Sequence, residues 1–266
     1  MEGITGVVSN EDVTPGKMNY ERFRNQMCHD VNAAIEGALE AGATEVVVND
    51  SHGQMTNLLL EQLHPVASLI SGVTKPLYMM EGIDKSFDCA MFVGYHSMVG
   101  GKGVLSHTMS GASSVQLNGR ATSEAEINAT IAGHFGVPVT MVSGDQYTVS
   151  EVREVMADVE GAIVKYAIDR LAARCLSPQE TRKLIKAAAK AGAIKARSTK
   201  PYRLGSGAEY TFQFLQPSMA ARAAILPFVE QLDVRTVRVR GVDAIDGWRR
   251  FWSALLLGRS AQPDAY

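Results

Sequence analysis

From Met18 to about Ala167, segments with helical periodicity alternate with short apolar runs. The first such segment ends near Gly42, and its apolar side chains recur every four residues: Phe23, Met27, Val31, Ile35 and Leu39. Apolar runs follow at Glu45–Val48, Ala90–Val93, Val137–Ser143 and Gly161–Ala167. This alternation is typical of an α/β domain, and we predict a largely parallel sheet flanked by helices.

The pattern changes after about residue 170. Ser177-Pro178 is a strong helix start, because serine caps a helix well and proline suits its first position. Strand-like runs at Tyr210–Leu215 and Arg235–Val242 then surround a helical stretch near Ala220–Leu232, and Trp248–Leu256 predicts a final helix. We therefore predict an α/β domain over 1–170 and a smaller α+β domain over 171–266.

The composition excludes several classes of protein. With 46% apolar and 20% charged residues, the 266-residue chain should fold as an ordinary globular protein. The net charge is −2 and no block of one sign occurs, so neither a nucleic acid nor a membrane is an expected partner. The three widely spaced cysteines suggest no disulfide framework, and we see neither a membrane-spanning run nor an export signal. We expect a cytoplasmic protein.

Two of the apolar runs lead to a histidine. Ala90–His96 is predicted as one buried strand with a histidine at its downstream end, and the run that starts at Thr44 continues to His52. The carboxyl ends of parallel strands share one edge of a sheet, so we expect the two imidazoles to lie in one crevice. A third histidine, His107, follows a glycine-rich loop.

Two glutamates complete the candidate site. Glu124 falls in the first turn of a helix that the capping pattern Ser123…Glu126 predicts, and Glu2 lies in a glycine-rich turn. Imidazole and carboxylate ligands without thiolates suit zinc or another divalent ion. A structural polar cluster would give the same pattern.

Other polar residues have simpler interpretations. His29, His64 and His134 are interpreted as structural or surface residues. Asp145 follows a strand, where it either lines the crevice or caps the next helix.

Several uncommon short motifs occur in a fixed order. They are Met1-Glu2-Gly3-Ile4-Thr5-Gly6, Asn19-Tyr20-Glu21-Arg22, Val48-Asn49-Asp50-Ser51-His52-Gly53, Leu63-His64-Pro65, Ile70-Ser71-Gly72, Phe92-Val93-Gly94-Tyr95-His96, Leu105-Ser106-His107-Thr108-Met109 and Cys175-Leu176-Ser177-Pro178. In these motifs the sequence resembles the zinc-dependent D-aminopeptidases of the DppA type, from Met1 to about Ser177 and more loosely beyond.

The resemblance implies a two-zinc metallopeptidase that assembles as a decameric ring and cleaves short peptides with an N-terminal D-residue such as D-alanine. Glu2 and His52 match the ligands of one ion, and His96 and Glu124 match those of the second. His107 matches the proposed catalytic histidine of the family.

The sequence departs from the family at its start. The family opens with Asp-x-Glu-Gly, whose aspartate bridges the ions and would lie one residue before Met1. We therefore expect either a trimmed or misassigned start or a lost bridge. For a chain that truly starts at Met1 we expect at most one ion, bound through His96 and Glu124 with or without His52.

Two alternative functions stay open. One is a non-catalytic peptide-binding or scaffold protein, and the other is a metal-dependent hydrolase of a different amide. The aromatic residues Trp248, Phe251 and Trp252 would either contribute to a subunit interface or pack in the core.

Overall fold

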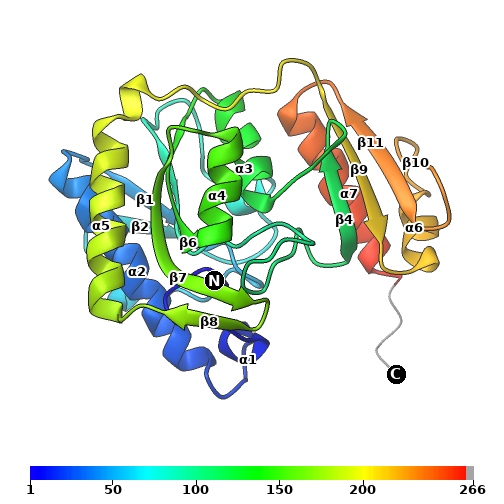
Figure 1. Ribbon diagram of the computed structural model, residues 1–266. Coiled ribbons are helices and arrows are strands. Elements are labelled where there is room, and N and C mark those ends of the chain that lie inside the picture. Colours follow the sequence, from blue (N-terminus) through cyan, green and yellow to red (C-terminus); the bar gives the residue numbers. More distant parts are fainter. Residues whose placement is uncertain (262–266) are drawn as a thin grey trace.

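The computed structural model describes residues 1–261, and its first unit is built on a four-stranded sheet in the order β3-β6-β7-β8 (Figure 1). The strands are β3 (Ala90–Phe92), β6 (Val139–Asp145), β7 (Glu160–Asp169) and β8 (Ala172–Cys175). The strands β3, β6 and β7 are parallel to one another, and β8 pairs antiparallel with β7. Every residue of β6 is buried, as expected for an apolar strand with helices on both faces of its sheet.

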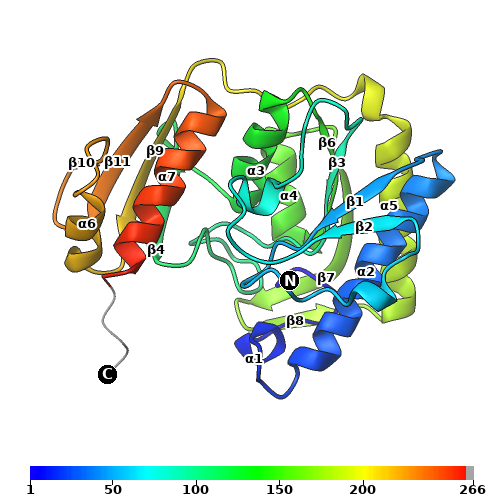
Figure 2. The same ribbon diagram turned by 180° about the vertical axis from the view of Figure 1, so that it is seen from behind.

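Helices cover both faces of this sheet. The helices of this unit are α1 (Asn10–Val13), α2 (Tyr20–Glu40), α3 (Glu124–His134), α4 (Gln146–Val155) and α5 (Pro178–Ile194), of which α4 and α5 pack directly on the strands. Figures 1 and 2 show β6 and β7 between α5 on one side and α4 on the other, with α2 beside α5. A Cβ atom at Gly37 of α2 would clash with the carbonyl oxygen of Lys186, so glycine permits this close helix packing.

A separate parallel pair, β1 (Val46–Asn49) and β2 (Ala67–Ile70), lies near β3 (Figure 2). Short 3₁₀ helices follow each strand of the pair, at Leu60–Gln62 (η1) and Tyr78–Met80 (η2). Residues of β1, β3 and α2 line a cavity of about 1120 Å³ that extends to the carboxyl ends of the strands. Within residues 1–261, β1 pairs only with β2 and β3 only with β6, so each strand has one edge without a partner.

The second unit is an antiparallel sheet in the order β10-β11-β9-β4-β5. Its strands are β4 (Ala112–Leu117), β5 (Arg120–Ala121), β9 (Ala208–Phe214), β10 (Glu230–Gln231) and β11 (Thr236–Gly241). The remaining helices are η3 (Ala196–Ser198), α6 (Pro217–Ala223) and α7 (Ala244–Arg259). Alternate residues of β9 are buried, and Phe251 of α7 stacks on Tyr210 at 4.6 Å between ring centroids. One apolar face of the sheet is thus covered by α7.

The predicted α/β class is confirmed, and most predicted elements are present. Two were predicted too long. The strand leading to His96 ends at Phe92, two residues before Gly94 with its φ of 73°. The helix predicted near Ala220–Leu232 ends at Ala223, and β10 occupies part of that range.

The division at residue 170 stays a prediction, but the strand pairing adds detail to it. β4 and β5, from the N-terminal part, join the second sheet. α5, from the C-terminal part, packs on α2, β6 and β7. Each predicted part therefore contributes an element to the other unit.

Within the described residues, no helix has both the length and the apolar character needed to cross a lipid bilayer.

Candidate metal centre

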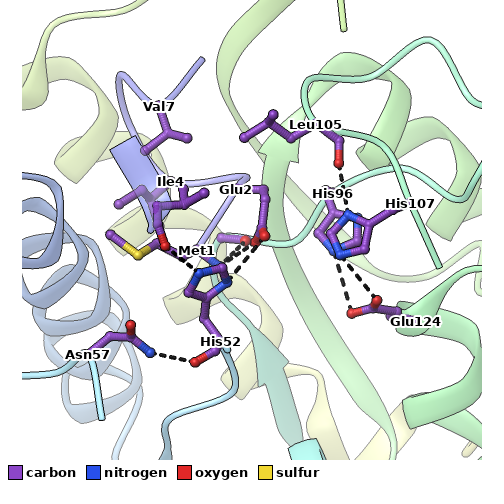
Figure 3. A network of polar contacts seen from close by, with 12 residues as sticks. Met1, Glu2, Ile4, Val7, His52, Asn57, His96, Leu105, His107 and Glu124 are labelled. Carbon is purple, nitrogen blue, oxygen red and sulfur yellow. Dashed lines mark hydrogen bonds and ion pairs between the residues drawn. The ribbon is translucent and has the colours of Figure 1, made fainter. Parts of the chain in front are cut away.

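Glu2 and His52 form the first pair of the site. Oε1 of Glu2 lies 3.2 Å from Nδ1 of His52, and both side chains are largely buried (Figure 3). The other ring nitrogen of His52 lies 2.8 Å from the carbonyl oxygen of Val13, which fixes the orientation of the imidazole. Nδ1 therefore faces the carboxylate.

The loop that carries His52 is organised by Asp50 at the end of β1. The buried Asp50 carboxylate accepts hydrogen bonds from the backbone N–H groups of Asn57 (2.6 Å) and Leu58 (2.7 Å). The Asn57 side chain donates to the Asp50 carboxylate and to the carbonyl oxygen of His52. These hydrogen bonds to one buried side chain hold the loop in one shape.

His96, His107 and Glu124 form the second group. Oε2 of Glu124 lies 3.4 Å from Nε2 of His96, and Oε1 lies 3.6 Å from Nε2 of His107. The two imidazoles stack with their centroids 4.0 Å apart (Figure 3). One potential ligand atom from each residue lies within 4.8 Å of the others.

The loop between the two histidines is attached to β6 and α4. Asp145 accepts a hydrogen bond from the backbone N–H of Val104 (2.7 Å), and Glu151 accepts one from that of Met98 (2.9 Å). Leu105 and Met109 flank His107 and have φ values of 52° and 53°, which are unfavourable for residues with a Cβ atom. Such backbone conformations often occur at functional sites.

The N-terminus of α3 presents Glu124. Ser123 caps the helix by accepting a hydrogen bond from the backbone N–H of Glu126, which confirms the predicted helix start. Glu124 accepts a hydrogen bond from the backbone N–H of Met109 at 2.7 Å. The Glu126 side chain contacts Arg120 and accepts from Thr122, instead of completing the capping box.

The electrostatics of the two groups follow from burial and proximity. Burial alone would lower the pKa of His96, but the Glu124 carboxylate outweighs burial and raises it to about 9. Burial would raise the pKa of Glu124, but His96 and His107 lower it to about 2. Burial also opposes ionisation of Glu2, whose pKa the chain's amino group and His52 hold well below its usual value.

These residues fit a divalent cation. Within residues 1–261, the cationic partners of the two buried carboxylates are the amino group of Met1 and His52 for Glu2, and His96 and His107 for Glu124, with no lysine or arginine at either. Buried carboxylates need a compensating positive charge, and imidazole nitrogen with carboxylate oxygen is a ligand set that zinc accepts. The ligand roles of these residues and the number of ions stay predictions.

The structure brings together all five residues singled out from the sequence, Glu2, His52, His96, His107 and Glu124, along one cavity. The alternative for Asp145, a helix cap, is confirmed, because its side chain accepts from the N–H of Thr148. Trp248 and Phe251 are fully buried, so they pack in the core.

Sequence reasoning missed Lys165. This lysine of β7 is fully buried, and its Nζ donates to the backbone carbonyl oxygens of Glu2 (2.5 Å), Ile4 (3.1 Å) and Val7 (2.7 Å). It thereby fixes the turn that carries Glu2. The available signal was a lysine inside the apolar run Gly161–Ala167, where a charged side chain is unusual.

Comparison with known proteins identifies the family of the chain. A family model described as D-aminopeptidase matches residues 1–253. A D-aminopeptidase of Bacillus subtilis (strain 168) is 38% identical over 251 residues, covering 94% of this chain and 92% of that protein. A solved structure matches this chain with a TM-score of 0.94 at 35% sequence identity. It is described as the Zn-dependent D-aminopeptidase DppA from Bacillus subtilis, a self-compartmentalizing protease, and the match covers 100% of this chain and 97% of the DppA chain. The chain therefore belongs to the D-aminopeptidase family of metallopeptidases.

Proposed function

We propose that this chain is a zinc-dependent aminopeptidase that releases the N-terminal residue of short peptides, with a preference for D-residues such as D-alanine. The observation that carries the proposal is the set of two buried glutamates and three histidines along one cavity, in a chain of the D-aminopeptidase family. A non-catalytic scaffold would have no need to bury two carboxylates without lysine or arginine partners.

Four residues are proposed to hold zinc: Glu2 with His52, and His96 with Glu124. When bound, zinc supplies a water of lowered pKa and polarises the scissile carbonyl. The proposed ligands are kept in place because Asp50 and Ser123 fix the segments on which His52 and Glu124 lie.

His107 is proposed as the catalytic histidine. Its side chain is 30% exposed, whereas that of His96 is 6% exposed, so His107 is the more accessible to a peptide in the cavity. The carbonyl oxygen of Leu105 can only accept a hydrogen bond, so Nδ1 of His107, at 2.8 Å, carries a proton. Nε2, which lies 3.6 Å from Oε1 of Glu124, is then the nitrogen proposed to take up a proton or, when protonated, to donate to a developing oxyanion.

The test combines metal analysis with a substrate panel. Zinc bound per chain is measured after dialysis, and release of the N-terminal residue is measured for D-Ala-D-Ala, L-Ala-L-Ala and mixed dipeptides. We expect stoichiometric zinc and fastest release of D-alanine. A protein that retains zinc but cleaves none of the dipeptides contradicts the proposed activity, and a protein without zinc contradicts the proposed centre.

We also propose that the chain forms a homo-oligomer in the cytoplasm, as a decameric ring. A solved relative described as self-compartmentalizing supports the assembly, and the three free cysteines fit a reducing compartment. Light scattering at physiological salt tests the assembly. A particle of 28.7 kDa, the mass of one chain, contradicts it.

A further inference from the structure

The cavity of the metal centre has a second wall, formed by the C-terminal helix. Trp252, Leu256 and Arg259 of α7 line the same cavity as His96, His107 and Glu124. These α7 residues are spaced by four and three, so they lie on one helix face. The adjacent face of α7 packs in the core through Trp248, Phe251 and Leu255. A substrate at the metal centre therefore lies beside a helix of the second unit.

Tyr78 marks the region between the two walls. Its ring lies 4.2 Å from that of Trp252 between centroids, and its φ of 51° is unfavourable for a bulky residue. Burial, with smaller contributions from Glu124 and Glu2 and against the opposing effect of Arg259, raises the pKa of its hydroxyl to about 12. The hydroxyl of Tyr78 is thus close enough to interact electrostatically with both carboxylates of the metal centre and with the guanidinium of Arg259.

Arg259 is an exposed cation without a protein partner. Within residues 1–261, its guanidinium makes no ion pair and no hydrogen bond, whereas Arg250 on the same helix is paired with Asp246. Arg259 is therefore available to bind an anion that enters the cavity.

The stem of Arg259 is held against the loop that follows His107. A Cβ atom at Gly111 would lie 2.9 Å from Cγ and 3.3 Å from Cδ of Arg259, so the stem packs directly over this glycine. Gly111 lies two residues after Met109, whose N–H donates to Glu124. The same short loop thus contacts the arginine at one end and the candidate ligand at the other.

We propose that Arg259 binds the C-terminal carboxylate of the substrate and makes the site selective for short peptides with a free carboxyl end. Guanidinium binds carboxylate through two parallel, charge-assisted hydrogen bonds, and a free carboxylate is the anion that every short peptide carries at the end opposite its scissile N-terminal residue. This assignment rests on the proposed peptidase function, for which it names the substrate class.

The experiment compares a peptide with its C-terminal amide. Zinc-loaded wild type, Arg259→Gln and Arg259→Lys are assayed with D-Ala-D-Ala and with D-Ala-D-Ala-amide. We expect Arg259→Gln to raise KM for the free acid roughly 10- to 100-fold with little change in kcat, which is the loss expected for hydrogen bonds to a charged group. The amide should be unaffected, and Arg259→Lys should recover part of the loss.

Arg249→Gln is the matched control, because Arg249 is exposed on the same helix but does not line the cavity. A second measurement separates this assignment from the proposed activity. Calorimetry measures binding of D-Ala-D-Ala analogues whose peptide carbonyl is replaced by CH₂, as free acid and as amide. Wild type should bind the acid more tightly, and Arg259→Gln should bind both equally.

The outcomes are distinct. If wild type cleaves neither peptide, the proposed peptidase function fails, and calorimetry still decides the role of Arg259. Equal binding of acid and amide by wild type, or equal losses for both peptides in Arg259→Gln, overturns the assignment.

Discussion

Lys165 stabilises the turn of Glu2 through three backbone carbonyl oxygens. We predict that Lys165→Met lowers the free energy of unfolding by about 3 kcal/mol, because buried carbonyls lose their donor. Zinc affinity should fall as well, since Glu2 lies on this turn. Urea unfolding and zinc titration measure the two effects, with the exposed Lys183→Met as control. Unchanged zinc affinity in a destabilised protein would show that the turn does not depend on this lysine.

His96 and His107 contact the same carboxylate but are proposed to have different roles. We predict that His96→Ala loses zinc, because a buried ligand is removed, whereas His107→Ala keeps zinc and loses at least roughly 100-fold in kcat, as for removal of an acid–base group. Metal analysis and steady-state kinetics measure both variants, and His134→Ala at the end of α3 is the control. Loss of zinc in His107→Ala would make His107 a ligand instead.

Residue types and local spacing were enough to select the five site residues, but not their supporting contacts. Lys165 lies on a strand whose apolar pattern was read correctly, yet its partners are 158 to 163 residues earlier in the chain. Arg259 likewise shares a cavity with Glu124 only through the fold. Contacts of this range depend on how the elements pack, which local periodicity does not encode.

Among the elements, the turn between β6 and α4 joins the scaffold to the site. Asp145 caps α4 by accepting from Thr148 and also accepts from Val104 in the His107 loop. We predict that Asp145→Ala lowers the free energy of unfolding by about 2 to 4 kcal/mol, since both a cap and a buried hydrogen bond are lost. Turnover should fall too, because the loop is released.

A second helix cap provides the control for this prediction. Asp243 caps α7 by accepting from Asp246 but is exposed. Asp243→Ala should lose only about 1 kcal/mol and keep kcat. Chemical unfolding and kinetics compare the two variants. Equal effects on stability and turnover would mean that the bond from Asp145 to the His107 loop contributes nothing.

Element boundaries were predicted best where a cap or turn residue defines them. Ser177 and Ser123 begin helices as expected, and Asn118-Gly119 turns between β4 and β5 with both φ values positive. The strand before His96 was predicted too long because apolar residues continue past Phe92 into the turn at Gly94. Hydrophobicity alone does not separate a strand from a buried turn.

At the scale of the whole molecule, the sequence predicted a largely parallel sheet and a second α+β unit, but not which strands belong to which sheet. The turn between β4 and β5 was predicted, but the pairing of β4 with β9, about 95 residues later, was not. The site depends on the pairing of β4 with β9, because the loop from His107 to Gly111 leads directly into β4. The arrangement that places α7 beside the metal centre is thus a property of the complete fold.

The cavity between β1 and β3 leads to a final prediction. Both strands have a free edge toward it, within residues 1–261, and its lining includes the apolar residues Val31 and Ile35 of α2 and Met91 of β3. Gly3 already donates to the carbonyl oxygen of Gly94, just past β3, so a segment added before Met1 would start beside this edge. A strand there would bury apolar side chains and pair with both edges.

We predict that six added residues rich in valine and isoleucine raise the free energy of unfolding by about 2 to 5 kcal/mol, after the cost of ordering them. A glycine-serine extension of equal length is the control, and urea unfolding measures both. Equal stability of the two fusions would show that the cavity does not accept a strand.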